Sequence, residues 1–113
     1  MEIIEGAGTW RLPAGAANDW VEHLTVPDLS VGTYCIPAGG VDDQSPHTED
    51  EIYVVTAGRA VFRDPSGEAE VRAGDTIVVA AGVEHRFVDV TEDLALVVVF
   101  APPEETRAGV SAT

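Results

Sequence analysis

Glycine and proline interrupt this chain so often that long regular elements have little room to form. The 113 residues include 11 Gly and 7 Pro, and the runs between them are short and rich in Val, Ile, Thr and aromatic residues, a composition that favours β-strands. No segment keeps the 3.6-residue apolar period of an amphipathic helix over ten residues. The sequence therefore predicts strands at 20–26, 29–36, 51–56, 59–63, 69–72, 76–80, 85–90 and 94–100.

Turn signals separate these runs, among them Pro27-Asp28, Ala57-Gly58 and Ala81-Gly82. Many short strands with regular turns indicate an all-β sandwich or barrel, and a closed barrel also removes exposed strand edges. The length fits one domain over residues 1–113. Within it we expect residues 1–18 to be an N-terminal arm or edge strand, with a possible short strand at 2–5, and residues 102–113 to be a tail.

The charge of the chain argues against several classes of partner. Asp and Glu number 20 against 6 basic residues, for a net charge of −14, and every basic residue is Arg. Such a field repels a phosphate backbone, so we expect no nucleic-acid and no membrane partner. The lack of lysine also excludes Schiff-base chemistry through a lysine amine.

The N-terminus and the cysteine content are those expected of a cytoplasmic protein. The first residues lack a basic segment followed by an apolar one, so we expect no signal peptide. Cys35 is the single cysteine, which excludes an internal disulfide, and we expect it to be buried and inert.

Two short stretches carry the residues with metal-binding chemistry. If the strand containing Glu51 extends backwards, His47, Glu51 and Tyr53 share one face, because strand side chains alternate. An imidazole and a carboxylate that converge in a dry interior are suitable ligands for a divalent metal. In the second stretch, after a glycine turn, His85, Phe87 and Asp89 are expected to share a face.

These stretches resemble the two motifs of the cupin superfamily. The first family motif, G-x5-H-x-H-x3,4-E-x6-G, matches at Gly39 or Gly40, His47, Glu51 and Gly58. The second, G-x5-P-x-G-x2-H-x3-N, matches at Gly74, Gly82 and His85, with Ala80 at the Pro position and Asp89 at the Asn position. The resemblance covers about residues 29–100 and implies an all-β double-stranded β-helix (jelly-roll) barrel. It also implies one divalent metal ion, Fe, Mn, Ni or Zn, and a homodimer that shares N-terminal strands.

One ligand of the family's three-His, one-Glu site is missing, because its first histidine falls at Ser45. Gln44 could supply an amide oxygen, or His23 an imidazole from an early strand. Alternatively, His47, Glu51 and His85 could bind the metal alone, as in two-His, one-carboxylate iron sites. We favour this last arrangement, with Gln44 as an occasional or supporting ligand.

The resemblance implies a small-molecule substrate or ligand. The favoured function is a metal-dependent enzyme, either an Fe- or Mn-type dioxygenase or a metal-assisted isomerase or lyase, and the alternative is a non-catalytic binding or sensor cupin. A storage role is disfavoured by the short chain and the retained ligands.

The remaining candidates have simpler interpretations. Tyr53 and Phe87 are expected to form the pocket wall, and His23 is more simply a hydrogen-bonded strand residue than a ligand. Four acidic residues around the first motif are expected to form a solvated loop: Asp42, Asp43, Glu49 and Asp50.

Overall fold

The computed structural model describes residues 1–44 and 46–103, which form an all-β fold. It has six strands: β1 (Asp19–Val26), β2 (Leu29–Ile36), β3 (Asp50–Asp64), β4 (Gly67–Arg72), β5 (Thr76–Val79) and β6 (Arg86–Ala101). Within that part of the chain, no helix is long and apolar enough to cross a membrane. The predicted strands are confirmed in position. The predicted tail falls mostly on residues 104–113, which lie outside the described residues.

Two predicted strand breaks are wrong, because β3 and β6 are long strands that bend instead of ending. The predicted turn at Ala57-Gly58 lies inside β3, where the pairing with β6 is irregular between Val55 and Val61. Gly58 has φ 92°, and a Cβ built there would lie 2.2 Å from the main-chain oxygen of Asp93. Glycine is therefore required at this bend because two backbones approach too closely for any side chain.

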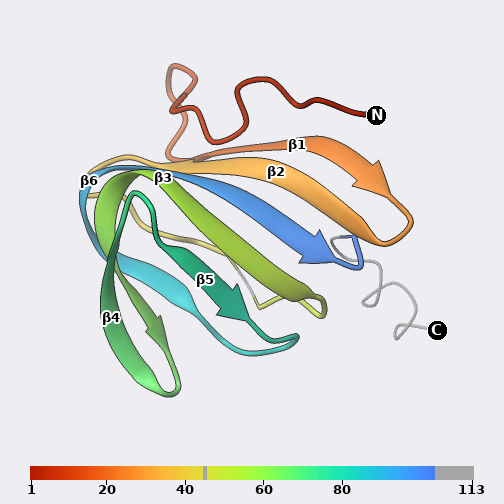
Figure 1. The fold of residues 1–113 in the computed structure, drawn as a ribbon. Coiled ribbons are helices and arrows are strands. Elements are labelled where there is room, and N and C mark those ends of the chain that lie inside the picture. The colour runs from red at the N-terminus through yellow and green to blue at the C-terminus, as the bar shows by residue number, and fades with distance from the viewer. Residues whose placement is uncertain (45, 104–113) are drawn as a thin grey trace.

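The strands form one curved antiparallel sheet in the order β1-β2-β6-β3-β4, with β5 paired to β3. The first half of β3 lies between β5 and β6, and its second half lies between β4 and β6. Figure 1 shows the consequence: the sheet folds over itself, so that β4 and the first half of β6 lie beneath β1 and β2.

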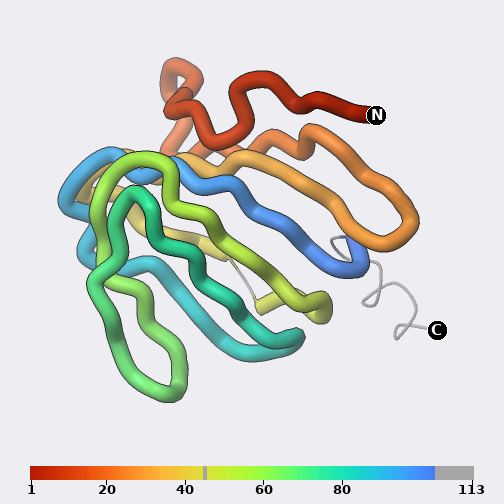
Figure 2. Tube along the Cα trace, viewed as in Figure 1, coloured from red at the N-terminus to blue at the C-terminus, as the bar shows by residue number. Residues whose placement is uncertain are grey.

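The N-terminal arm lies against part of the outer face of this sheet, and residues 1–18 contain no strand. Figure 2 shows the arm looping above β1 and β2. The amide of Gly8 donates to Thr33 Oγ1 at 2.9 Å, and its carbonyl accepts from Thr56 Oγ1 at 2.5 Å. These contacts place Gly8 between β2 and β3 on the outside of the fold.

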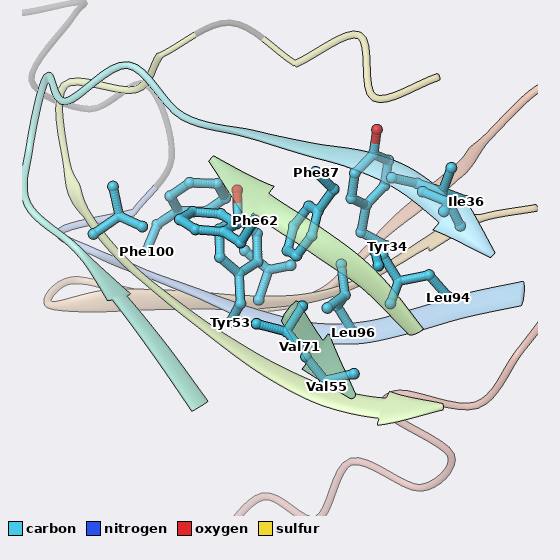
Figure 3. Packing of buried hydrophobic residues seen from close by; sticks show 14 residues of the cluster. Tyr34, Ile36, Tyr53, Val55, Phe62, Val71, Phe87, Leu94, Leu96 and Phe100 are labelled. Carbon is cyan, nitrogen blue, oxygen red and sulfur yellow. The ribbon is translucent and has the colours of Figure 1, made fainter. Parts of the chain in front are cut away.

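The inward-facing side chains form a single apolar core between the folded halves of the sheet. Figure 3 shows a mainly aromatic end of this core, with Phe100, Phe62 and Tyr53, and an opposite end where Tyr34 lies with Ile36 and Leu94. Tyr53 is at the centre of the aromatic end, with its ring 5.0 Å from Phe87 and 6.0 Å from Phe62 in edge-to-face contact. The polar side chains described next are embedded beside these rings.

Candidate functional site

Strand β3 places two of the candidate residues in the interior. Glu51 and Tyr53 lie on its inward face and are 1% and 0% exposed. The strand begins at Asp50, so the alternation expected to carry His47 onto the same face does not reach it. His47 lies in the preceding loop, and the prediction that one strand aligns His47 with Glu51 is wrong.

His85 enters the same interior from the turn before β6. Its Nδ1 lies 2.8 Å from the carbonyl oxygen of Val83, and its Nε2 lies 3.1 Å from Glu51 Oε1 and 2.8 Å from Tyr53 Oη. The ring of Phe62 stacks on the imidazole with a centroid distance of 5.7 Å. The structure thus brings together two predicted metal ligands and one predicted pocket residue.

The proton positions in this cluster follow from its partners. A carbonyl only accepts, so Nδ1 of His85 carries a proton and donates it to Val83. Tyr53 donates its one proton to Gln44 Oε1 at 2.9 Å, so its contact with Nε2 is a hydrogen bond only if Nε2 is protonated too. Burial favours the neutral imidazole, but the interactions with Glu51 and Val83 outweigh burial and raise the pKa of His85 above 6.5.

The carboxylate of Glu51 is otherwise poorly satisfied. Neither of its oxygens accepts a well-directed hydrogen bond from the described residues, and the 3.1 Å approach of His85 Nε2 is an ion-pair contact. Burial and this carboxylate raise the pKa of Tyr53, so the phenol keeps its proton. A buried anion of this kind requires a proton or a cation beside it.

Gln44 reaches this cluster because Asp42 fixes the loop that carries it. Asp42 is 1% exposed, and its Oδ1 accepts from Tyr34 Oη at 3.0 Å and from the amide of Gln44 at 3.1 Å. Its Oδ2 accepts from the amide of Phe87 at 2.9 Å. One buried carboxylate therefore ties the loop to β2 and β6.

His47 lies at the edge of this group. Its ring contacts Phe100 with a centroid distance of 4.6 Å, and its carbonyl accepts from the amide of Gly82 at 2.7 Å. Among residues 1–44 and 46–103, no three His, Cys, Asp or Glu side chains are grouped closely enough to form a metal site as they lie. Ser45, at the position of the family's first histidine, lies outside the described residues.

His23 and Phe87 have different surroundings. His23 is exposed on β1, where its Nε2 lies 2.6 Å from Thr33 Oγ1, under the N-terminal arm and away from the Glu51–His85 pair. Phe87 is 1% exposed and packs on Tyr53 and Phe62. Asp89 does not share the face of Phe87 as expected, because its φ of 48° turns it outward to an exposed position.

The expectation of a solvated acidic loop is wrong for half of its members. Asp42 and Glu49 are each 1% exposed, whereas Asp43 and Asp50 are exposed. Sequence reasoning missed Asp42 because an acidic residue in a glycine-rich loop is most simply a surface residue. The available signal was its position in the first motif, between Gly39-Gly40 and His47. Cys35 is buried, as expected, and burial raises the pKa of its thiol.

Comparison with known families gives the same class of protein as the fold. The sequence model of the cupin domain family matches residues 32–101 of this chain. An uncharacterized protein from Streptomyces coelicolor is 43% identical over 91 residues, which span 79% of this chain and 87% of that protein. The chain therefore belongs to the cupin family, as the two motifs predicted.

Solved structures share the fold at low sequence identity. KdgF from a Halomonas species superposes with a TM-score of 0.70 at 20% identity, covering 80% of this chain and 85% of that one. The DMSP lyase DddQ from Ruegeria pomeroyi gives a TM-score of 0.70 at 16% identity, covering 88% of this chain and 54% of that one. These likenesses confirm the predicted double-stranded β-helix.

Proposed function

We propose that this protein is a metal-binding cupin that acts as a small-molecule enzyme, with His85, Glu51 and His47 as the metal ligands. The observation that carries the proposal is the buried Glu51 carboxylate beside His85 Nε2. Nε2 of His85 and Oε1 of Glu51 lie 3.1 Å apart, close enough for one ion to contact both at the distances of about 2.0–2.2 Å usual for imidazole and carboxylate ligands. The pair therefore fits two adjacent ligands of one ion.

The second ring nitrogen of His85 supports the same assignment. Metal-binding histidines usually donate their other N–H to a carbonyl or carboxylate, which fixes the tautomer. Here Nδ1 donates to Val83, so Nε2 faces Glu51 and is available to a metal once its proton leaves. His47 would complete the set, because the hydrogen bond from Gly82 holds its main chain beside the turn that carries His85. Gln44 would support the site through Tyr53.

A bound divalent ion would supply a Lewis acid or an oxygen-binding centre to this interior. The residues of the chain would supply the rest of the environment. Tyr53 would hold a proton at Oη beside the substrate, and Phe62 and Phe87 would exclude water from the pocket. We propose a dioxygenase of the Fe or Mn type, or a metal-assisted isomerase or lyase.

Elemental analysis of protein purified without an affinity tag tests the metal assignment. We expect about one divalent ion per chain, and we expect Glu51→Gln and His85→Ala to lose most of it. His23→Ala is the matched control, because His23 is exposed and hydrogen-bonded to Thr33, and it should keep the wild-type metal content. Full metal content in His85→Ala would contradict the assignment, and the same result in His47→Ala would remove His47 from it.

A binding or sensor cupin without turnover is the second candidate. It is favoured because, among the described residues, no three His, Cys, Asp or Glu side chains lie close enough together to hold a metal ion. Incubating the metal-loaded protein with sugars, enols and phenolics, while O2 consumption and product formation are followed, separates the two. Conversion of any compound that is lost in Glu51→Gln supports the enzyme, whereas binding without conversion supports the sensor.

We also propose a homodimer built on the outer face of the sheet. Ile52 of β3 and Val78 of β5 lie opposite each other and are 38% and 75% exposed, with Val99 on the other side of Ile52. They line a hollow of about 530 Å³. Met1 and Ile3 of the arm are also exposed. A second copy would cover these apolar surfaces, and burial of such area is the main driving force for association.

A further inference from the structure

A cavity at the rim of the fold opens next to the buried Glu51–His85 pair. It encloses about 320 Å³ between the β3–β4 turn and the start of β6. Its lining residues are Arg63, Asp64, Pro65, Glu84, His85 and Arg86. His85 forms part of the cavity wall while its side chain is only 2% exposed, so a molecule held in this cavity would lie against the outer side of a residue that the proposed metal site uses.

Two arginines flank this cavity in an arrangement that costs stability. Arg63 on β3 and Arg86 on β6 are directly paired across the antiparallel ladder, so their Cβ atoms share one face about 5 Å apart. Like charges at that spacing repel each other. The chain has only 6 basic residues against 20 acidic ones, so this pairing concentrates positive charge in a strongly negative protein.

A second pair of facing arginines in the same fold has acidic side chains that offset its charge. Arg59 is paired with Arg72, and its guanidinium contacts the carboxylates of Glu70 at 3.0 Å and Glu92 at 3.2 Å. Two acidic side chains therefore offset that pair. Neither Arg59 nor Arg72 lines the cavity at the rim.

The pair at the rim is left only partly neutralised. Arg63 uses one of its five N–H donors on Glu68, at 2.7 Å, while Arg86 forms no ion pair within the described part of the chain. Asp64 also lines the cavity, but its Oδ1 accepts from the amide and hydroxyl of Ser66 in the turn. Glu84 is exposed and, like Asp64, makes no ion pair with Arg86.

We infer that Arg86, assisted by Arg63, recognises an oxyanion group of the substrate, a carboxylate or a phosphate, at the mouth of the site. A guanidinium matches the two oxygens of such a group with paired N–H donors. None of the four acidic residues around the first motif, Asp42, Asp43, Glu49 and Asp50, lines this cavity. The inference names the substrate class of the proposed enzyme and rests on that proposal for its consequence, although the anion site itself requires no metal.

Titration of the ¹⁵N-labelled protein with benzoate, phenyl phosphate and benzamide tests the inference by NMR. Benzamide has nearly the same shape as benzoate but no charge, so it isolates the oxyanion. We expect one or both anions to shift the resonances of residues 84–86, and benzamide to bind at least tenfold more weakly, because a hydrogen bond to a charged group is worth about 1.5–3 kcal/mol.

Two variants make the result specific. Arg86→Gln should weaken anion binding about tenfold, and Arg72→Gln should leave it unchanged, because Arg72 is also exposed but does not line this cavity. Equal binding of benzamide and benzoate, or an Arg86→Gln protein that binds the anions like the wild type, would overturn the inference. Running each titration with and without added metal separates the two proposals. Arg86-dependent binding in a protein that takes up no metal would support the anion site and contradict the proposed metal centre.

Discussion

His85 Nε2 lies 3.1 Å from Glu51 Oε1, and the two side chains are 2% and 1% exposed. A buried carboxylate is costly without a positive charge beside it. Nε2 of His85 can carry a proton or bind a metal ion, but it cannot do both. Proton and metal therefore compete for one position, and this competition gives the metal-free protein properties that can be measured.

The first prediction concerns the pKa of His85 in metal-free protein. We expect NMR titration of its imidazole to give a pKa above 6.5, because the interactions with Glu51 and Val83 outweigh the opposing effect of burial. Glu51→Gln removes the charge while it keeps the shape of the side chain, so it should lower that pKa. A pKa at or below 6.5 in the wild type would contradict the assigned network.

The same shift has a consequence for stability. A group whose pKa is raised on folding stabilises the folded state fully below its unfolded pKa and loses that contribution as the pH rises through the folded pKa. The metal-free wild type should therefore lose free energy of unfolding from pH 6.5 upward through the raised pKa of His85. Chemical denaturation over this range should show a flatter dependence in Glu51→Gln.

The second prediction concerns Asp42, which holds the loop that carries Gln44. Asp42→Ala leaves the buried Tyr34 hydroxyl and the Phe87 amide without their acceptor, and we expect a loss of about 2–4 kcal/mol in the free energy of unfolding. Asp43→Ala is the control: Asp43 is exposed and accepts only a 3.4 Å contact from Asn18, so about 0.5 kcal/mol or less is expected. Equal midpoints of urea denaturation for the two variants would show that Asp42 does not hold the loop.

The fold was predictable from the sequence because the signals that define its strands and motifs lie close together along the chain. Strand positions follow from apolar runs between Gly and Pro, and Glu51 and His85 follow from motif spacing. The buried role of Asp42 was not predictable, because it depends on partners on two distant strands. The pairing of Arg63 with Arg86 depends on the register of β3 against β6, which spacing along the chain does not contain. His47 was misplaced for a local reason: β3 begins three residues after it.

The third prediction concerns the bend of β3 at Gly58. Gly58 and Gly74 both have positive φ, 92° and 101°, so alanine is strained at either position. Only at Gly58 would the new Cβ meet backbone, at 2.2 Å from the Asp93 oxygen, whereas nothing lies within 4 Å at Gly74. We expect Gly74→Ala to cost about 1 kcal/mol and Gly58→Ala at least about 2 kcal/mol more. Similar thermal midpoints for the two variants would contradict a close β3–β6 crossing at this bend.

The last prediction tests the proposed dimer face. Val78→Lys places a charge at the centre of the exposed apolar stripe formed with Ile52, and because Val78 is 75% exposed the fold of the single chain should tolerate it. Burying an unpaired ammonium at an interface is costly, so we expect this variant to be monomeric by light scattering coupled to size-exclusion chromatography where the wild type is dimeric. Val41→Lys is the matched control, since Val41 is 70% exposed in the loop after β2 and outside the stripe. A dimer that survives Val78→Lys must use another surface, and a monomeric wild type at micromolar concentration would remove the proposed dimer altogether. If both variants dissociate equally, the effect comes from added charge rather than from the face formed by β3 and β5, and the assignment of that face fails.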